Sequence, residues 1–278
     1  TTDPSVVRFA NIHGQDTPAL GFGTYELEEE TCQHAVESAL EIGYRHVDTA
    51  RIYGNEESVG RAIRNSHVDR DDLFLTSKVW REDLDPERLD QELKVSLRLL
   101  DVDYLDLYLI HWPNSAFPLE KTLEAMMKHR ENGLVRHIGV SNFPPNLFRK
   151  AVSLAPIFCN QVEYHPFLGQ GENIEIARAH DAMITAYSPL AQGQVSGDPT
   201  LESIAVKHGK TAQQVALRWL LEQESVAAIP RSSTSDHIAS NFQVFDFQLD
   251  DHDHAQISSL TKDRRLVDPS FAPDWANG

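Results

Sequence analysis

The stretch Tyr104-Leu105-Asp106-Leu107-Tyr108-Leu109-Ile110-His111 decides the fold, because it is almost wholly apolar and stops at one imidazole. An apolar run of this kind is typical of a strand buried on both faces, as in a parallel sheet. Two earlier runs end similarly: Tyr44-Arg45-His46-Val47-Asp48-Thr49-Ala50, followed by Tyr53, and Leu73-Phe74-Leu75-Thr76-Ser77-Lys78. The runs lie roughly 30 residues apart, as in a parallel β/α protein whose strand ends converge on one face. We therefore expect a carboxylate, a phenol, an ammonium and an imidazole to meet there.

The overall properties of the chain exclude several classes of protein. Its 278 residues allow one β/α barrel or two ordinary domains. A formal net charge of -17 argues against binding to nucleic acid or to an anionic membrane surface. The apolar runs are strand-sized, so no membrane span is expected, and Thr1-Thr2-Asp3-Pro4 lacks the apolar region of a signal peptide. Cys32 and Cys159 make no disulfide framework and fit buried thiols in a reducing cytoplasm.

Strand and helix patterns alternate along the whole chain without a dividing linker. Residues 6–17 are predicted to form a hairpin that leads into the first strand. Strands are expected over 18–23, 46–49, 73–78, 105–111, 136–140, 159–163, 183–187 and 225–229. Helices are expected over 28–42, 56–64, 86–100, 119–132, 145–154, 173–180, 212–222, 235–242 and 251–260, with only a turn at 204–208.

Eight strand–helix units predict a single α/β domain over residues 1–278, a (β/α)8 TIM barrel with an N-terminal β-hairpin. An open doubly wound sheet is the alternative, and a glycine-rich turn after its first strand usually marks it. Gly21-Phe22-Gly23-Thr24-Tyr25-Glu26 has the first two glycines of that motif but Glu26 where the third would stand. The barrel is therefore favoured.

The four strand-end groups suit the protonation of an oxygen that gains negative charge. Tyr53 is the general-acid candidate at neutral pH if its pKa is lowered, and a nearby Lys78 can lower it by stabilising phenolate. Asp48 can hold Lys78 in place, and His111 can donate a hydrogen bond to a substrate oxygen. Hydride addition to a carbonyl creates an oxygen of this kind. Each residue alone also has an ordinary structural explanation, so the combination carries the hypothesis.

Five motifs resemble those of the aldo-keto reductases. They are Gly43–Ala50, Tyr53-Gly54-Asn55-Glu56, Ser77-Lys78-Val79-Trp80, Leu109-Ile110-His111-Trp112-Pro113 and Ile138-Gly139-Val140-Ser141-Asn142-Phe143, within a resemblance spanning residues 21–247. The resemblance implies a barrel that binds a nicotinamide cofactor without a Rossmann fold. It also implies a catalytic tetrad of Asp48, Tyr53, Lys78 and His111, in which Tyr53 is the acid in reduction and the base in oxidation. Bacterial members that reduce diketo-gluconate and small aldehydes are the most similar.

The resemblance also assigns the nicotinamide end of a cofactor site. Ser141, Asn142 and Gln161 would hydrogen-bond the carboxamide, and Tyr187 would stack on the ring. The run from Ser188 through Leu190 and Gln192 to Gly193 would line the pyrophosphate. Gly23 and Thr24 would approach the nicotinamide, beside Asp48 and His111.

The adenosine end departs from the family pattern Ile-Pro-Lys-Ser, which is followed by an Arg and an Asn. The cofactor residues expected here are Ile229, Arg231, Ser232, Ser233, His237 and Asn241. Arg231 replaces the lysine and can still bind a 2′-phosphate. A mostly neutral His237 stands in place of the arginine, beside Asp236. We therefore expect NADPH to bind with weakened discrimination, and NADH to be used as well.

Aromatic residues are expected to wall the substrate pocket. By resemblance, Tyr25, Trp80 and Trp112 join Tyr53 and His111, and Phe22 is a further candidate. The C-terminal tail, Phe271 to Trp275, is predicted to fold over the active-site mouth, with Trp275 as its contact. A short loop at 81–86 predicts an open pocket and broad carbonyl specificity. No metal site is expected: the acidic and histidine residues of 250–254 point in different directions on a helix.

The sequence thus predicts an NADPH-dependent reductase of aldehydes and ketones that is monomeric and cytoplasmic. Two alternatives stay open. One is a non-catalytic regulatory subunit that binds the cofactor on the same barrel. The other is an alcohol dehydrogenase that works in the oxidative direction, because the tetrad serves both directions.

Overall fold

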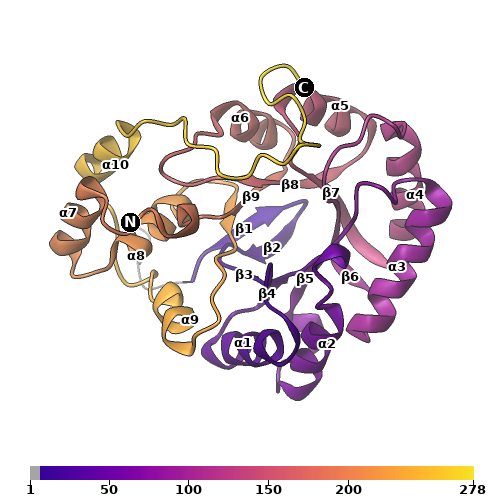
Figure 1. Cartoon of the computed structure of the whole chain (residues 1–278), viewed down its shortest axis with the longest axis horizontal. Helices are drawn as coiled ribbons and strands as arrows, with labels where there is room; N and C mark the ends of the chain where they lie inside the picture. Colours follow the sequence, from indigo (N-terminus) through magenta and orange to yellow (C-terminus); the bar gives the residue numbers. More distant parts are fainter. Residues whose placement is uncertain (1–6) are drawn as a thin grey trace.

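A computed structural model describes residues 7–278 and shows a closed parallel barrel (Figure 1). Eight strands follow one another around the sheet in chain order, and every neighbouring pair is parallel. The barrel strands are β3 (Phe22–Gly23), β4 (His46–Asp48), β5 (Phe74–Val79), β6 (Leu105–Ile110), β7 (Val135–Ser141), β8 (Ile157–Glu163), β9 (Met183–Tyr187) and β10 (Val226–Ala228). The predicted (β/α)8 barrel is confirmed, and the open sheet is excluded.

The barrel closes between its first and last strands. Leu20 pairs with Ala228 in a parallel bridge, and the Gly21 amide donates to the Ala228 carbonyl at 2.8 Å. Farther along, the Gly23 amide donates to the carbonyl of Pro230 at 3.0 Å. A side-chain carbon at Gly23 would lie 2.8 Å from the Ile229 carbonyl oxygen, so this approach of two backbones requires glycine.

An antiparallel hairpin of β1 (Phe9–Ile12) and β2 (Gln15–Pro18) caps one end of the barrel. Ala10 and Ile12 pack in one cluster with Phe74 and Phe158, which stand near the beginnings of their strands. The hairpin therefore seals the amino-terminal end of the barrel, and the carboxyl-terminal end is left for the site. The predicted hairpin is confirmed from Phe9 onward, whereas Val6 lies outside the described residues.

Helices surround the barrel on the outside (Figure 1). They are α1 (Glu29–Ile42), α2 (Glu56–Asn65), α3 (Pro86–Leu100), α4 (Leu119–Glu131), α5 (Pro145–Leu154), α6 (Gly171–Ala179), α7 (Pro199–His208), α8 (Ala212–Leu221), α9 (Ser235–Phe242) and α10 (Asp251–Ser258). Single 3-10 turns occur at η1 (Arg51–Tyr53), η2 (Arg70–Asp72) and η3 (Ala191–Gly193).

The helix caps follow from local chemistry. Pro86 begins α3 where a missing N–H leaves no bond unmade, and Gly133 follows α4 with a left-handed φ of 78°. Thr211 and Gln214 form a reciprocal capping box at the start of α8. The prediction of a mere turn at 204–208 is wrong, because α7 begins at Pro199 with Asp198 accepting from the Leu201 amide. An Asp-Pro pair is itself a helix-start signal.

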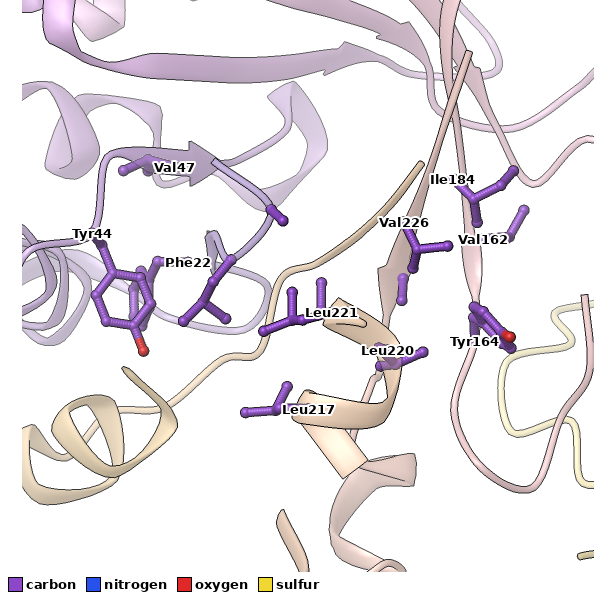
Figure 2. Close-up of a cluster of buried hydrophobic side chains, with 14 of the residues drawn as sticks. Phe22, Tyr44, Val47, Val162, Tyr164, Ile184, Leu217, Leu220, Leu221 and Val226 are labelled. Atoms are coloured by element: carbon purple, nitrogen blue, oxygen red, sulfur yellow. The ribbon is translucent and has the colours of Figure 1, made fainter. Parts of the chain in front are cut away.

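Apolar side chains join the helices to the sheet. Figure 2 shows Leu217, Leu220 and Leu221 of α8 between Phe22 and Tyr44 on one side and strands β8 to β10 on the other, all in one buried cluster. Burying a leucine contributes about 1.5–3 kcal/mol. Phe22 is thus part of the core, where its ring meets Tyr44, and the expectation that it walls the substrate pocket is wrong. Cys32 and Cys159 are buried free thiols, as predicted.

Candidate active site

Lys78 is the centre of the strand-end cluster. It belongs to β5, is fully buried, and donates from Nζ to Asp48 Oδ1 at 2.5 Å, to the Tyr53 hydroxyl at 3.2 Å and to the Thr49 carbonyl at 3.0 Å. An ammonium has three N–H donors, so all three are used. Asp48 ends β4, Tyr53 ends η1, and Gln161 Nε2 donates to the second oxygen of Asp48 at 2.7 Å. The barrel therefore brings Asp48, Tyr53 and Lys78 into direct contact.

Burial and charge act against each other on this cluster. For Lys78, burial lowers the pKa, but Asp48 and Tyr53 together raise it more, so the ammonium stays charged. For Tyr53, burial raises the pKa, and the opposing effect of Lys78 does not cancel that rise. Lys78 acts in the expected direction on the Tyr53 pKa, but burial outweighs it, so the net shift is upward and the phenol is protonated at neutral pH.

His111 completes the group at the end of β6. Its ring lies 5.6 Å from the Tyr53 ring and 5.4 Å from Trp80, in edge-to-face geometry with both. Burial, with the positive charge of Lys78, lowers the pKa of His111 well below 6.5, so its imidazole is neutral at pH 7. Its buried Nδ1 has no hydrogen-bond partner within residues 7–278. A neutral imidazole at this place can donate one N–H to a ligand oxygen.

A cavity of about 1200 Å³ opens over these groups at the carboxyl ends of the strands. Its walls include most of the residues expected from the sequence: Gly23, Thr24, Tyr25, Asp48, Tyr53, Trp80, His111, Trp112, Ser141, Asn142, Gln161, Tyr187, Ser188, Leu190, Gln192, Gly193, Ile229, Arg231, Ser232, His237 and Asn241. Lys78, Ser233 and Trp275 do not line it. Lys78 is fully buried and bonded to the Tyr53 hydroxyl, Ser233 is exposed to solvent, and Trp275 packs against Trp112 without reaching the cavity wall.

The residues expected at the carboxamide form one hydrogen-bonded group. The Tyr187 hydroxyl donates to Asn142 Oδ1 at 2.6 Å, and Asn142 Nδ2 donates to the His111 carbonyl at 3.1 Å. Ser141 Oγ donates to the Gln161 carbonyl at 2.8 Å. Asn142 takes a left-handed φ of 62°, a conformation that asparagine tolerates better than most residues. These bonds link β7, β8 and β9 at the floor of the cavity.

A buried asparagine positions the rim, and the sequence reasoning missed it. Asn55 donates from Nδ2 to the carbonyls of Thr24 and Leu27, at 2.8 and 2.9 Å, and accepts from Thr49 Oγ1 at 2.6 Å. These bonds tie the loop after β3 to the end of β4. Asn55 stands two residues after Tyr53. That position beside a candidate catalytic tyrosine was the one sequence feature that could have predicted its role at the rim.

The far end of the cavity is more exposed and carries opposite charges. Arg231 Nη1 lies 3.4 Å from Glu26 Oε2, and both side chains are about half exposed. Glu26 and Glu28 both line the cavity, which the sequence reasoning did not anticipate. His237 stands in the first turn of α9 beside Asp236. The net positive charge at this end is therefore small.

The tail supplies an apolar wall through Phe271. Its ring packs edge to face on Trp80 at 5.6 Å and on Trp112 at 5.4 Å, and Leu266 to Pro269 also line the cavity. Trp275 contacts Trp112 at 6.0 Å and donates from Nε1 to Asp268. The tail thus lies over the mouth as predicted, with Phe271 rather than Trp275 in the wall.

The acidic and histidine residues of 250–254 serve the fold. Asp250 caps α10 and pairs with Lys207, Asp253 accepts from His208, and His254 bonds to Glu222. Within residues 7–278, no group of three or more His, Cys, Asp or Glu side chains is arranged to hold a metal ion. No helix in that range is both long and apolar enough to cross a membrane. The monomeric state and cytoplasmic location stay predictions.

The closed parallel barrel and its buried Lys78 cluster define the class: a β/α-barrel protein with a polar site at the carboxyl ends of its strands, facing a large cavity. Comparisons with known proteins narrow this class. A family model described as "Aldo/keto reductase family" matches residues 19–262. The chain belongs to the aldo/keto reductase family, whose members reduce small carbonyl compounds with NAD(P)H.

Relatives of known name cover nearly the whole chain. The methylglyoxal reductase DkgB of Salmonella typhi is 41% identical over 264 residues, which are 93% of this chain and 98% of the relative. The glyoxal reductase of Bacillus subtilis (strain 168) is 41% identical over 91% of this chain and 92% of its own. A crystal structure assigned provisionally as 2,5-diketo-D-gluconic acid reductase B superposes with a TM-score of 0.95, at 41% identity and 98% coverage of both chains.

Proposed function

We propose that this enzyme reduces small aldehydes and ketones to alcohols with NADPH, and that Tyr53 is the general acid. The observation that carries the proposal is the hydrogen bond from Lys78 to Tyr53, made while Lys78 is also bound to Asp48. It fixes a protonated phenol at the edge of the cavity beside a neutral His111. A non-catalytic regulatory role needs no such arrangement.

In the proposed reaction, the substrate carbonyl oxygen lies between Tyr53 and His111. His111 donates an N–H to that oxygen and so orients the carbonyl. As the carbon accepts a hydride, the oxygen becomes negative, and the Tyr53 hydroxyl gives it a proton. The Lys78 ammonium stabilises the phenolate that remains, and Asp48 keeps Lys78 charged and in place. Reduction uses the protonated form of Tyr53, whereas oxidation needs its phenolate, and the raised pKa of Tyr53 keeps the protonated form at neutral pH.

The residues of the cavity fit a nicotinamide dinucleotide. A volume of about 1200 Å³ exceeds the roughly 300–1,000 Å³ of ordinary small-ligand pockets, which leaves room for cofactor and substrate together. When bound, such a cofactor supplies the hydride. Ser141, Asn142 and Gln161 would hold its carboxamide, and Tyr187 would lie against its ring.

The adenosine end supports NADPH binding with relaxed discrimination. Arg231 is the cation that would hold a 2′-phosphate, with Ser232, Ser233, His237 and Asn241 around it. Glu26 already pairs with Arg231 and would compete with that phosphate. NADH lacks the phosphate and avoids this competition, so we expect appreciable use of NADH as well.

Small 1,2-dicarbonyl compounds are the proposed substrates. Two relatives, each 41% identical, are named methylglyoxal reductase and glyoxal reductase. The substrate side of the cavity is walled by Tyr25, Trp80, Trp112 and Phe271, which suits compact and uncharged carbonyls. The loop between β5 and α3 is only six residues long, so it covers little of the substrate side of the cavity.

The test is to measure NADPH oxidation by the purified enzyme with methylglyoxal, glyoxal, a simple aldehyde and a simple ketone. We expect the two dicarbonyls to give the highest kcat/KM, and NADH to support the same reactions. Consumption of neither cofactor with any of the four carbonyls would exclude the proposed function.

A further inference from the structure

Glu163 is a buried carboxylate that the proposed reaction does not use. It ends β8 and its side chain is fully buried. Oε1 accepts from the amides of Leu266 at 3.0 Å and Val267 at 2.8 Å, and Oε2 accepts from the Leu266 amide at 2.9 Å and from His165 Nε2 at 2.7 Å. An ionised carboxylate only accepts hydrogen bonds, and here every partner is a donor.

The neighbouring histidine fixes this arrangement. The Phe167 amide donates to His165 Nδ1 at 3.2 Å, so a neutral His165 carries its proton on Nε2. That proton points at Glu163 Oε2. Three separate groups thus converge on one carboxylate, and two of them are backbone amides of the tail. Charge-assisted bonds of this kind are about twice as strong as bonds between neutral groups.

The tail reaches the cavity directly beyond this anchor. In Figure 1, the whole tail, residues 259–278, runs from α10 past α6 toward α5. Before the anchor, the Arg264 amide donates to the Phe167 carbonyl at 2.9 Å. After it, Leu266 to Pro269 and Phe271 line the cavity. No other carboxylate within residues 7–278 accepts from the amides of Leu266 and Val267.

We infer that Glu163 is a positioning residue that anchors the tail by its backbone and thereby fixes the Phe271 wall, which favours compact carbonyl substrates over bulky ones. The part of this inference that concerns substrates rests on the proposed carbonyl reduction. The effect is local, because the last anchored residue, Val267, lies only four positions before Phe271 in the chain. Loosening it frees Phe271 from Trp80 and Trp112 while the Lys78 cluster is left in place.

The experiment compares Glu163→Gln with a matched variant, Glu222→Gln. Glutamine keeps the shape but presents one NH2 group to donors, which breaks at least one bond. Glu222 is a demanding control because this mostly buried glutamate also accepts from a backbone amide, that of Leu249, and from a histidine, His254. It also accepts from the fully buried Arg218, so Glu222→Gln lowers stability without touching the tail anchor. Glu222 does not line the cavity.

Two readouts separate anchoring from activity. The first is trypsin cleavage of the folded protein after Lys262, Arg264 or Arg265, identified by the mass of the fragments. We expect cleavage to be about tenfold faster in Glu163→Gln than in Glu222→Gln, because local opening of the tail exposes these sites. The second is the ratio of kcat/KM for phenylglyoxal to that for methylglyoxal, which should rise about tenfold while the Kd of NADPH, from fluorescence titration, stays within about twofold.

A double variant decides whether Glu163 acts through Phe271. Phe271→Ala should shift the substrate ratio in the same direction, and adding Glu163→Gln to it should change the ratio by no more than about twofold, because the two substitutions remove one wall. Equal cleavage in the two glutamine variants, an unchanged ratio, or fully additive effects would each overturn the inference. Failure of the wild-type protein to reduce any carbonyl would overturn the proposed function instead, and the cleavage readout is independent of it.

Discussion

The two ends of the cavity are built in opposite ways. At the tetrad end, Lys78 is fully buried and donates its three N–H groups to Asp48, the Thr49 carbonyl and the Tyr53 hydroxyl. At the adenosine end, Arg231 is about half exposed and makes one 3.4 Å contact with Glu26. Buried charges become costly when a partner is lost, whereas exposed pairs contribute little. We infer from this difference that the barrel core holds the catalytic groups in one arrangement, whereas exposed residues such as Arg231 and Glu26 determine which cofactor binds better.

The largest effect is expected where the charge is most buried. Lys78→Met should lower kcat/KM about 10³-fold, because the phenolate left after proton transfer loses its cation. It should also destabilise the protein by about 3–5 kcal/mol, since Asp48 keeps a buried charge without its partner. Steady-state kinetics and urea unfolding measure the two effects. Lys150→Met removes an exposed pair with Glu120. It should change kcat/KM by no more than about twofold and the free energy of unfolding by no more than about 1 kcal/mol. Losses in this control as large as those of Lys78→Met would contradict the comparison.

The pH profile of reduction tests the protonation states at the tetrad end. Burial raises the pKa of Tyr53, so the acid form is complete at neutral pH and is lost only as pH rises through that raised value. The pKa of His111 is lowered well below 6.5, so His111 adds no break near neutrality. We therefore expect kcat to be flat from about pH 6.5 up to the Tyr53 pKa, which lies above the ordinary value of 10.0, and then to fall about tenfold per pH unit, while oxidation rises with pH. A break near pH 7 to 8 in reduction would show that Tyr53 is not held protonated.

The smallest effect is expected at the adenosine end. Glu26→Gln should lower the Kd of NADPH by about two- to fivefold, because Arg231 no longer pairs with a carboxylate. The Kd of NADH should not change, and the effect should disappear in an Arg231→Gln background. Glu87→Gln, which removes an exposed charge from α3, on the far side of the barrel from α9 (Figure 1), is the control. An equal gain for both cofactors would mean that Glu26 does not compete for the 2′-phosphate.

Much of this structure followed from the sequence because parallel barrels carry strong local signals. Apolar strand runs and single polar groups at their ends were enough to place Asp48, Lys78 and His111 on one face. The helix at 199–208 was missed because only its Asp-Pro start marks it, and its apolar face is short. These are features that a window of neighbouring residues can show.

The rest depends on contacts between distant residues. Phe271 takes the wall position because the tail is held at Glu163, more than 100 residues earlier in the chain. The Glu26–Arg231 pair joins loops 205 residues apart. Burial raises the Tyr53 pKa and Lys78 lowers it, so the direction of the net shift depends on which effect is larger. No sequence pattern predicts their relative size.

Tyr53→Phe is the most direct test of the account, because it removes one hydroxyl and leaves the ring against Tyr25 and His111. Single-turnover reduction of methylglyoxal with saturating NADPH should slow about 10²–10⁴-fold, while the Kd of NADPH stays within about twofold. A variant that retains the wild-type single-turnover rate would contradict the assignment of Tyr53 as the acid, and with it the central claim that the Lys78 cluster exists to hold that proton.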